Sequence, residues 1–159
     1  MREWEDPEVL AQRYAQMVYR MAYARTGSKT DAEDVVQEVF LRLVRARPSF
    51  RDEEHGKAWL LRVAANCTND LFRLPWRKRE EPLRPSMAAE EGPEFSGVLE
   101  AVLALPEKYR LVVHLYYYEE LSTAEIGRII GRSEGAVRSR LFRAKRMLRD
   151  LLGEEEHHA

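Results

Sequence analysis

The residues best suited to chemistry in this 159-residue sequence are cations near its C-terminal end. Seven arginines and lysines stand between Arg132 and Arg149 against a single glutamate, whereas the whole chain has a formal net charge of −1. Cations gathered in this way bind nucleic-acid phosphates, and arginine can also hydrogen-bond to guanine edges in the major groove. The pattern predicts that this end of the chain binds DNA.

These side chains need a scaffold, and residues 123–140 have the pattern of a helix-turn-helix. Small Gly127 allows two helices to approach closely, Gly131 suits a turn with positive φ, and Val137 can pack the second helix onto the first. On its exposed side, the second helix then carries Glu134, Arg138, Ser139, Phe142 and Arg143. Such a face can enter a major groove. The alternative interpretation is a plain helical hairpin with a solvated basic face.

A second candidate face lies on a helix expected from about Lys57 to Arg73. An aromatic, an amide and charged groups recur at intervals of three or four residues, which places them on one side of the helix. They are Trp59, Arg62, Asn66, Asp70 and Arg73. Exposed aromatics and cations suit single-stranded DNA, whose bases stack and whose phosphates attract positive charge. The alternative is that Trp59 is part of the core.

Two earlier helices complete the N-terminal half. We expect the first from about Glu8 to Arg25 and the second from Thr30, where Thr30–Glu33 has capping-box spacing, to just before Pro48. The second helix carries an apolar stripe that we expect to be buried: Ala32, Val35, Val36, Val39, Phe40, Leu43 and Val44. Its opposite side carries Asp34, Gln37, Glu38 and Arg42. The plain interpretation of that side is a solvated face with i, i+4 ion pairs.

A change in composition separates the two helical sets. The segment from Leu74 to Gly97 holds four of the seven prolines and five glutamates, which is typical of a mobile linker. Further helices follow, including one that opens at the capping box Ser122–Glu125 and one capped by Ser133 that ends near Leu152. We therefore predict an all-α fold of two small helical domains. The expected boundaries are 1–74 and 98–152 for the domains, 75–97 for a flexible linker and 153–159 for an acidic tail.

The sequence argues against catalysis and against bound cofactors. Cys67 is the only cysteine and shares a helix face with apolar residues, so we expect a buried hydrophobe and neither a disulfide nor a metal site. No Gly-rich phosphate loop and no nucleophile–histidine–acid set is present. We expect no enzyme activity, no cofactor and no small-molecule substrate. No apolar run is long enough to span a membrane, which indicates a cytoplasmic protein without membrane insertion.

At this point the motifs resemble a known family. Residues 124–131 followed by residues 133–144 resemble the C-terminal promoter-binding domain of the extracytoplasmic-function (ECF) sigma factors of bacterial RNA polymerase, which belong to the sigma-70 family. In the N-terminal half, residues 31–40 look like the helix that docks on polymerase, and residues 59–66 like the helix that opens the minus-ten element. Departures occur at Tyr116, Arg132 and Ala136, so the promoter sequence is not predicted.

The resemblance implies roles for three groups of residues. The minus-ten DNA contacts would be made by Phe50, Arg51, Trp59, Arg62, Asn66 and Arg73. The minus-thirty-five contacts would be made by Thr123, Glu134, Arg138, Ser139, Phe142 and Arg143. Core polymerase would be bound by Asp34, Gln37, Glu38 and Arg42. The first domain would thus bind polymerase and open the minus-ten element, and the second would bind the minus-thirty-five element.

The implied partners are promoter DNA and core RNA polymerase, through the clamp helices of its largest subunit and the flap of its second-largest subunit. An anti-sigma factor is a further expected partner. The main alternative is a two-domain helix-turn-helix regulator that binds duplex DNA without docking on polymerase. A protein–protein adaptor is disfavoured by the basic stripe, and an enzyme by the missing catalytic set.

Overall fold

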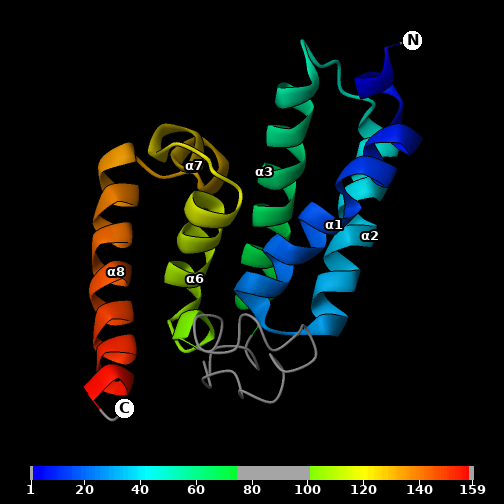
Figure 1. The fold of residues 1–159 in the computed structure, drawn as a ribbon. Helices are drawn as coiled ribbons and strands as arrows, with labels where there is room; N and C mark the ends of the chain where they lie inside the picture. The colour runs from blue at the N-terminus through cyan, green and yellow to red at the C-terminus, as the bar shows by residue number, and fades with distance from the viewer. Residues whose placement is uncertain (1, 75–100, 158–159) are drawn as a thin grey trace. The chain divides into compact units, whose positions relative to one another are not determined.

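The computed structural model describes residues 2–74 and 101–157, with side chains up to residue 153, and every regular element in these ranges is helical. The chain divides into two compact units. One contains η1 (Glu3–Glu5), α1 (Pro7–Thr26), α2 (Lys29–Ala46) and α3 (Glu53–Phe72), and the other contains α6, α8 and most of the residues between them (Figure 1). The predicted all-α, two-domain fold class is confirmed. The expected linker over residues 75–97 lies outside the described residues.

Short polar residues begin the three long N-terminal helices. The Asp6 side chain accepts a hydrogen bond from the Glu8 amide at 3.0 Å, and Gly27 ends α1 in a left-handed conformation with φ 67°. At α2 the cap is Ser28, which accepts from the Asp31 amide at 3.2 Å, so the capping box expected at Thr30 is wrong by two residues. Ser28 and not Thr30 is the N-cap of α2 because α1 ends at Gly27, so the chain enters the next helix immediately.

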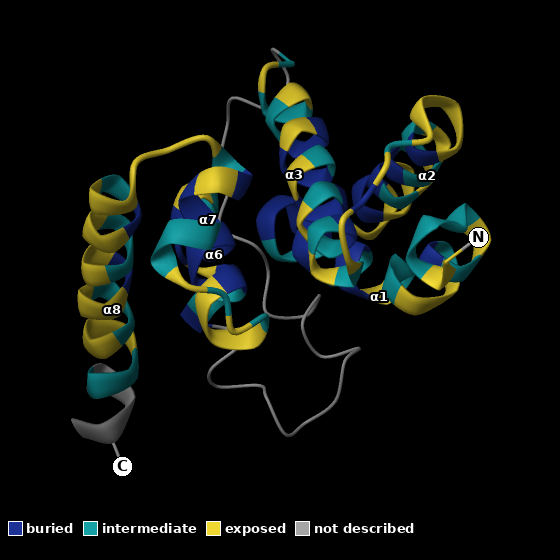
Figure 2. Cartoon of the chain, turned by 90° about the horizontal axis from the view of Figure 1, so that it is seen from above, coloured by how far each residue is buried: buried dark blue, intermediate teal, exposed yellow. Residues whose placement is uncertain are grey.

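The core of the N-terminal unit lies between α1, α2 and α3, whose buried sides face one another in Figure 2. Its fully buried side chains include Leu10, Val18, Met21, Val39, Leu43, Leu60 and Leu61. The buried stripe of α2 is narrower than predicted. Val36 and Phe40 are only partly buried, and Val44 is 50% exposed beside Leu41 at 43%. Because α2 packs on its two neighbouring helices along one side only, these neighbours bury a narrow band of its surface. The apolar residues at the edges of the predicted stripe stay accessible.

The C-terminal unit contains α6 (Glu107–Val113), the π-helix η5 (His114–Tyr118), most of α7 (Thr123–Ile130) and α8 (Glu134–His157). Leu105, Tyr109, Val113 and Ala144 form one buried cluster, on which Val102, Met147 and Leu148 pack. This cluster joins α6 to the middle of α8. It fixes the direction in which α8 projects its first turns.

Two helix ends differ from the sequence expectation. α3 begins at Glu53 and not near Lys57, because Asp52 caps it by accepting from the His55 amide at 2.8 Å. α8 continues to His157 and not to Leu152. Glutamate is a good helix former, and one interior glycine costs only about 1 kcal/mol, so Gly153 does not end the helix.

Candidate DNA interfaces

The turn between α7 and α8 has the geometry that a helix-turn-helix needs. A Cβ added at Gly127 would lie 2.6 Å from the backbone oxygen of Arg132, so only glycine fits there. Gly131 adopts φ +72°, and the Arg132 amide donates to the Gly127 carbonyl at 2.9 Å. Val137 and Ile126 are fully buried. The turn and its packing are those predicted from the sequence.

Both helices of this motif carry side-chain caps. Ser122 and Glu125 form a reciprocal capping box: each side chain accepts from the other's backbone amide at 3.1 Å. Ser133 caps α8 by accepting from the Ala136 amide at 3.1 Å. The caps satisfy amides that a helix start leaves unpaired, so the first turns of α7 and α8 are held in place.

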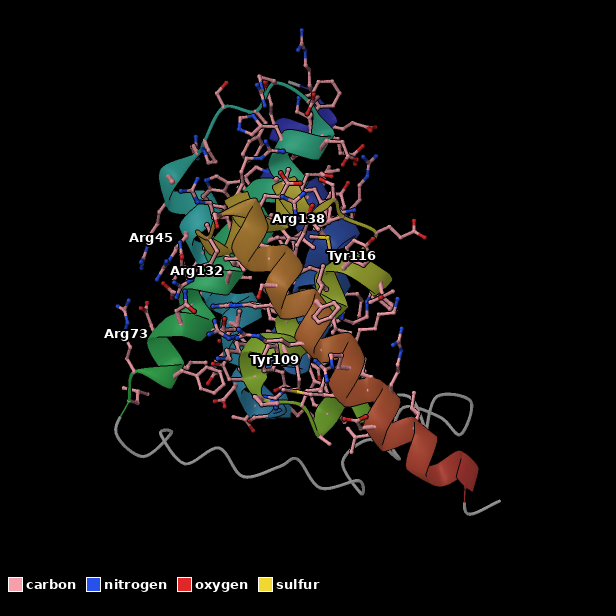
Figure 3. All side chains as sticks on the ribbon, turned by 90° about the vertical axis from the view of Figure 1, so that its left-hand side faces the viewer. Arg45, Arg73, Tyr109, Tyr116, Arg132 and Arg138 are labelled. Atoms are coloured by element: carbon pink, nitrogen blue, oxygen red, sulfur yellow. The ribbon has the colours of Figure 1, made fainter. Side chains whose placement is uncertain are left out.

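The first turns of α8 present the predicted duplex-reading face to solvent. Its members are all exposed: Glu134, Arg138, Ser139, Phe142 and Arg143. Phe142 is 63% exposed, and the Arg146 guanidinium lies 6.0 Å from its ring centroid. Figure 3 places Arg138 near the N-terminal end of α8, the end that enters a major groove in helix-turn-helix proteins.

One carboxylate links the two helices on this face. The Thr123 hydroxyl donates to Glu134 Oε1 at 2.8 Å, and Arg138 Nη1 approaches the same oxygen at 3.4 Å. Three of the residues predicted to contact the minus-thirty-five element therefore contact one another.

On α3 the structure exposes most of the second predicted face. Arg62, Asn66, Asp70 and Arg73 are exposed, and Arg73 lies 3.6 Å from Asp70. Trp59 is partly buried and its ring contacts that of Phe50 edge-on, so the residue belongs in part to the core, and a role toward DNA stays a prediction. The amide and the cations can reach a DNA strand without any change in the fold.

Phe50 is the exception among the predicted minus-ten residues. Its ring is only 4% exposed and lies against Gly56, where an added Cβ would sit 3.1 Å from a ring carbon. It contacts the rings of Trp59 and His55 edge-on, with centroids 5.9 and 5.3 Å away. The ring therefore positions Trp59 and offers no free face for a base. Arg51, next to it, is exposed, and its amide donates to His55 Nδ1 at 3.1 Å.

Arg25, near the end of α1, holds the last turns of α3 and was missed by the sequence reasoning. The side chain is buried, and it donates to Thr68 Oγ1 at 2.8 Å and to Asn69 Oδ1. The guanidinium also lies 5.0 Å from the Phe72 ring centroid. An arginine in the last turn of a helix is usually explained by its favourable interaction with the helix dipole. The local sequence therefore does not distinguish Arg25, and its role becomes visible only from its contacts with α3.

The start of α3 is held by a second long-range network. Tyr14 and Arg13 of α1 donate to Glu53 at 2.8 and 2.7 Å, and Arg13 also donates to Glu3 of η1 at 2.6 Å. Burial and then the Glu53 hydrogen bond raise the pKa of Tyr14 to about 12. The hydrogen bond from Tyr14, followed by that from Arg13, lowers the pKa of Glu53. Both ends of α3 are thus fixed from α1.

The predicted docking side of α2 is accessible. Asp34 and Gln37 are exposed, and Arg42 donates to Glu38 at 2.9 Å, the i, i+4 pair expected from the sequence. The Glu38 hydrogen bond raises the pKa of Arg42. Leu41 and Val44 are exposed apolar neighbours that the sequence reasoning placed elsewhere or omitted. Cys67 is buried, as predicted, and burial raises its pKa.

Exposed aromatics on η5 were also missed. Tyr116, Tyr117 and Tyr118 are 39, 58 and 58% exposed. They stand on the five-residue π-helix, and the sequence analysis singled out only Tyr116, as a departure from the family pattern.

The residues that the structure describes include neither a metal-binding group nor a membrane-spanning helix. Among those residues, no three His, Cys, Asp or Glu side chains are grouped so that they could hold a metal ion. No helix there combines the length and the apolarity needed to cross a bilayer.

Both units match known protein families. Residues 10–78 match Sigma-70 region 2, and residues 97–148 match Sigma-70, region 4. The ECF RNA polymerase sigma factor SigW of Bacillus subtilis is 32% identical over 160 residues, which cover 87% of this chain and 84% of SigW. The chain belongs to the ECF RNA polymerase sigma factors. SigE of Mycolicibacterium smegmatis is 35% identical over 96% of this chain, which spans 62% of that longer protein.

Two solved structures share the fold. CnrH, solved in complex with the cytosolic domain of CnrY, is 27% identical with a TM-score of 0.68, covering 93% of this chain and 88% of CnrH. The sigma factor RpoE of Bartonella quintana, solved with the anti-sigma factor NepR, has a TM-score of 0.73 at 21% identity, covering 92% of this chain and 96% of RpoE. The latter likeness concerns the fold alone.

Proposed function

We propose that this ECF sigma factor binds core RNA polymerase, directs it to promoters and opens the DNA there. The observation that carries the proposal is the exposed face at the start of α8, held by a glycine-dependent turn and two side-chain caps. Its donors suit both phosphates and base edges of the minus-thirty-five element. The residues proposed to form this interface are Thr123, Glu134, Arg138, Ser139, Phe142 and Arg143.

The minus-ten element is assigned to α3. The exposed side chains of Arg62, Asn66 and Arg73 support contacts to a separated strand, and the accessible part of Trp59 supports stacking with a base. Arg51 lies exposed beside them. Phe50 keeps a role here as the support of the Trp59 ring, because its own ring is buried. Unstacked bases cost a few kcal/mol per step, which such contacts would offset.

Docking on polymerase is assigned to α2. Asp34, Gln37, Glu38 and Arg42 would meet the clamp helices of the largest subunit, and the C-terminal unit would meet the flap of the second-largest subunit. Exposed Leu41 and Val44 support an interface, since accessible apolar groups beside charged ones are typical of such surfaces. The chain would act in the cytoplasm without chemistry of its own. CnrH and RpoE were each solved with a partner protein, and we propose an anti-sigma factor for this chain too.

The test is to mix the full chain with core RNA polymerase and a promoter library. Co-elution with the enzyme and transcripts that start from a defined set of promoters are the expected result. A chain that binds duplex DNA but neither co-elutes nor supports transcription would be a regulator acting alone, and the proposal would then be wrong. Asp34→Ala with Gln37→Ala is a suitable docking variant, because both side chains are exposed and their loss leaves the core intact.

A further inference from the structure

Glu134 is an unexpected residue type for a surface that meets DNA. A carboxylate beside phosphates repels them, and the surrounding face is strongly basic. Its pairing with Arg138 does little for the stability of the fold, because the two side chains are 45 and 65% exposed and such pairs are weak. A role in recognition explains the position of this carboxylate better than a role in folding.

The contacts of Glu134 indicate what that role is. One oxygen, Oε1, accepts from Thr123 at the start of α7 and faces Arg138 Nη1 one helical turn along α8. Thr123 fixes the carboxylate from a second helix, so the anion cannot follow the arginine freely. An arginine held in this way keeps its remaining N–H groups available while it loses much of its freedom to swing toward a phosphate.

We propose that Glu134 is a positioning residue, which together with Thr123 holds the Arg138 guanidinium for base edges and away from phosphates. The inference rests on the proposed function of α8 as the helix that binds the minus-thirty-five element. Glu134 then raises the discrimination between sequences and lowers the affinity for DNA in general. A residue that merely stabilised α8 would lower both affinities together.

The experiment uses the full chain assembled with core RNA polymerase. An upstream duplex is selected from a randomised pool with the parent protein, and its binding is compared with that of a scrambled duplex over a salt series. Glu134→Ala should bind the scrambled duplex roughly threefold or more tightly, with a salt slope steeper by about 1, because one repelling charge is gone. Its preference for the selected duplex should fall about tenfold, the value of one good base contact.

Three further variants make the result specific. Glu134→Gln keeps an acceptor for Thr123 but loses the charge, so it should fall between the parent and Glu134→Ala. Thr123→Val removes the fixing hydrogen bond and should also reduce discrimination. Asp150→Asn, on the exposed part of the same helix, removes one negative charge away from the turn and should leave the preference unchanged.

A double-mutant cycle tests whether Glu134 acts through Arg138. In an Arg138→Ala background, Glu134→Ala should cause no further loss of preference. If it does, Glu134 contacts a base itself, as a carboxylate can at cytosine N4, and the positioning role is wrong. An unchanged preference in Glu134→Ala also overturns it. If the parent protein selects no sequence at all, the proposed function of α8 fails, and this inference fails with it.

Discussion

The two helices proposed to face DNA, α8 and α3, are held in place in different ways. The turn that leads into α8 is fixed by its neighbours in sequence, namely the Ser122–Glu125 box, Gly127, Gly131 and the Ser133 cap, while Ala144 in the middle of the helix packs on Leu105, Tyr109 and Val113. α3 is fixed from α1, through pairs such as Arg25–Thr68 and Tyr14–Glu53 that lie 43 and 39 residues apart in sequence. The first turns of α8 thus depend mainly on local sequence, whereas α3 depends more on tertiary contacts from α1.

This difference suits the two tasks. A helix that enters an intact major groove needs one rigid geometry, which short-range turn chemistry provides at low entropic cost. A helix face that receives several unstacked bases contacts them from different turns. Such a helix must therefore be held in place at several points along its length. The buried arginine at one end of α3 and the Tyr14 network at the other provide this support.

The largest effect is expected from Arg25→Ala. Loss of hydrogen bonds from a buried charged donor should lower the free energy of unfolding of the N-terminal unit by about 2–3 kcal/mol. Promoter opening should fail at temperatures where the protein is still folded, while binding to the upstream duplex persists. Denaturant unfolding and permanganate footprinting measure the two effects.

Arg45→Ala is the matched control for that variant, because Arg45 is an exposed arginine near the end of α2. It should stay within about 0.5 kcal/mol of the parent. Arg25→Lys keeps the positive charge but lacks the planar, multiply donating guanidinium, so it should recover only part of the free energy of unfolding that Arg25→Ala loses. If folded Arg25→Ala opens promoters normally, α3 does not depend on this contact, and the contrast with α8 is lost.

A smaller effect is expected from Gly127→Ala, at the locally encoded turn. Forcing a Cβ to 2.6 Å from a backbone oxygen costs roughly 1–3 kcal/mol, offset by about 1 kcal/mol from the better helix propensity of alanine. The net loss should appear in unfolding of the C-terminal unit and in weaker upstream binding. Gly135→Ala is the control: nothing lies within 4 Å of its Cβ, so it should be stabilising. Equal free energies of unfolding for Gly127→Ala and Gly135→Ala would contradict the argument that the Arg132 backbone leaves no room for a Cβ at Gly127.

The same contrast explains what could be predicted from the sequence. The positive-φ glycine, the close approach at Gly127 and the caps each rest on one residue type at one place and were predicted correctly, whereas the contacts of Glu134 with Thr123 and Arg138 were not predicted. Periodicity also predicted which side of α2 and of α3 is accessible, although Glu38, Arg42 and Trp59 on those sides are only partly exposed. What the periodicity could not give was depth of burial: Phe50 is core, and Val44 is half exposed.

The missed features depend on contacts that no local pattern records. Arg25 is chemically ordinary until α3 packs against it. The cap of α2 was placed at Thr30 because of its capping-box spacing with Glu33, whereas the end of α1 at Gly27 makes Ser28 the cap. The exposed tyrosines stand on a π-helix, which departs from the 3.6-residue period used for prediction.

A third prediction separates positioning from contact on α3. Asn66→Ala removes an exposed amide, so the free energy of unfolding should not change measurably. Opening of a linear promoter should weaken roughly tenfold, the equivalent of about 1.4 kcal/mol and of one lost hydrogen bond. A pre-melted promoter should restore little activity, because base capture itself is impaired. Normal permanganate reactivity with a folded Asn66→Ala protein would remove this residue from the site.

The smallest effect is expected at Tyr14, and it tests the tertiary support at the start of α3. Tyr14→Phe removes one partly buried hydrogen bond to Glu53 and should cost about 0.5–1 kcal/mol at neutral pH. The parent's contribution from Tyr14 is complete below pH 10 and is lost as the pH rises from about 10 to 12. The sign follows because the unfolded phenol ionises near 10, whereas the pKa of Tyr14 in the folded chain is raised to about 12.

Urea unfolding across this window should therefore show a gap in the free energy of unfolding between parent and variant that closes toward pH 12. Tyr117→Phe, at a side chain 58% exposed, should show no such gap. The absence of a gap at neutral pH would mean that Tyr14 acts only through the packing of its ring, which Phe retains, and that Glu53 is held by Arg13 alone.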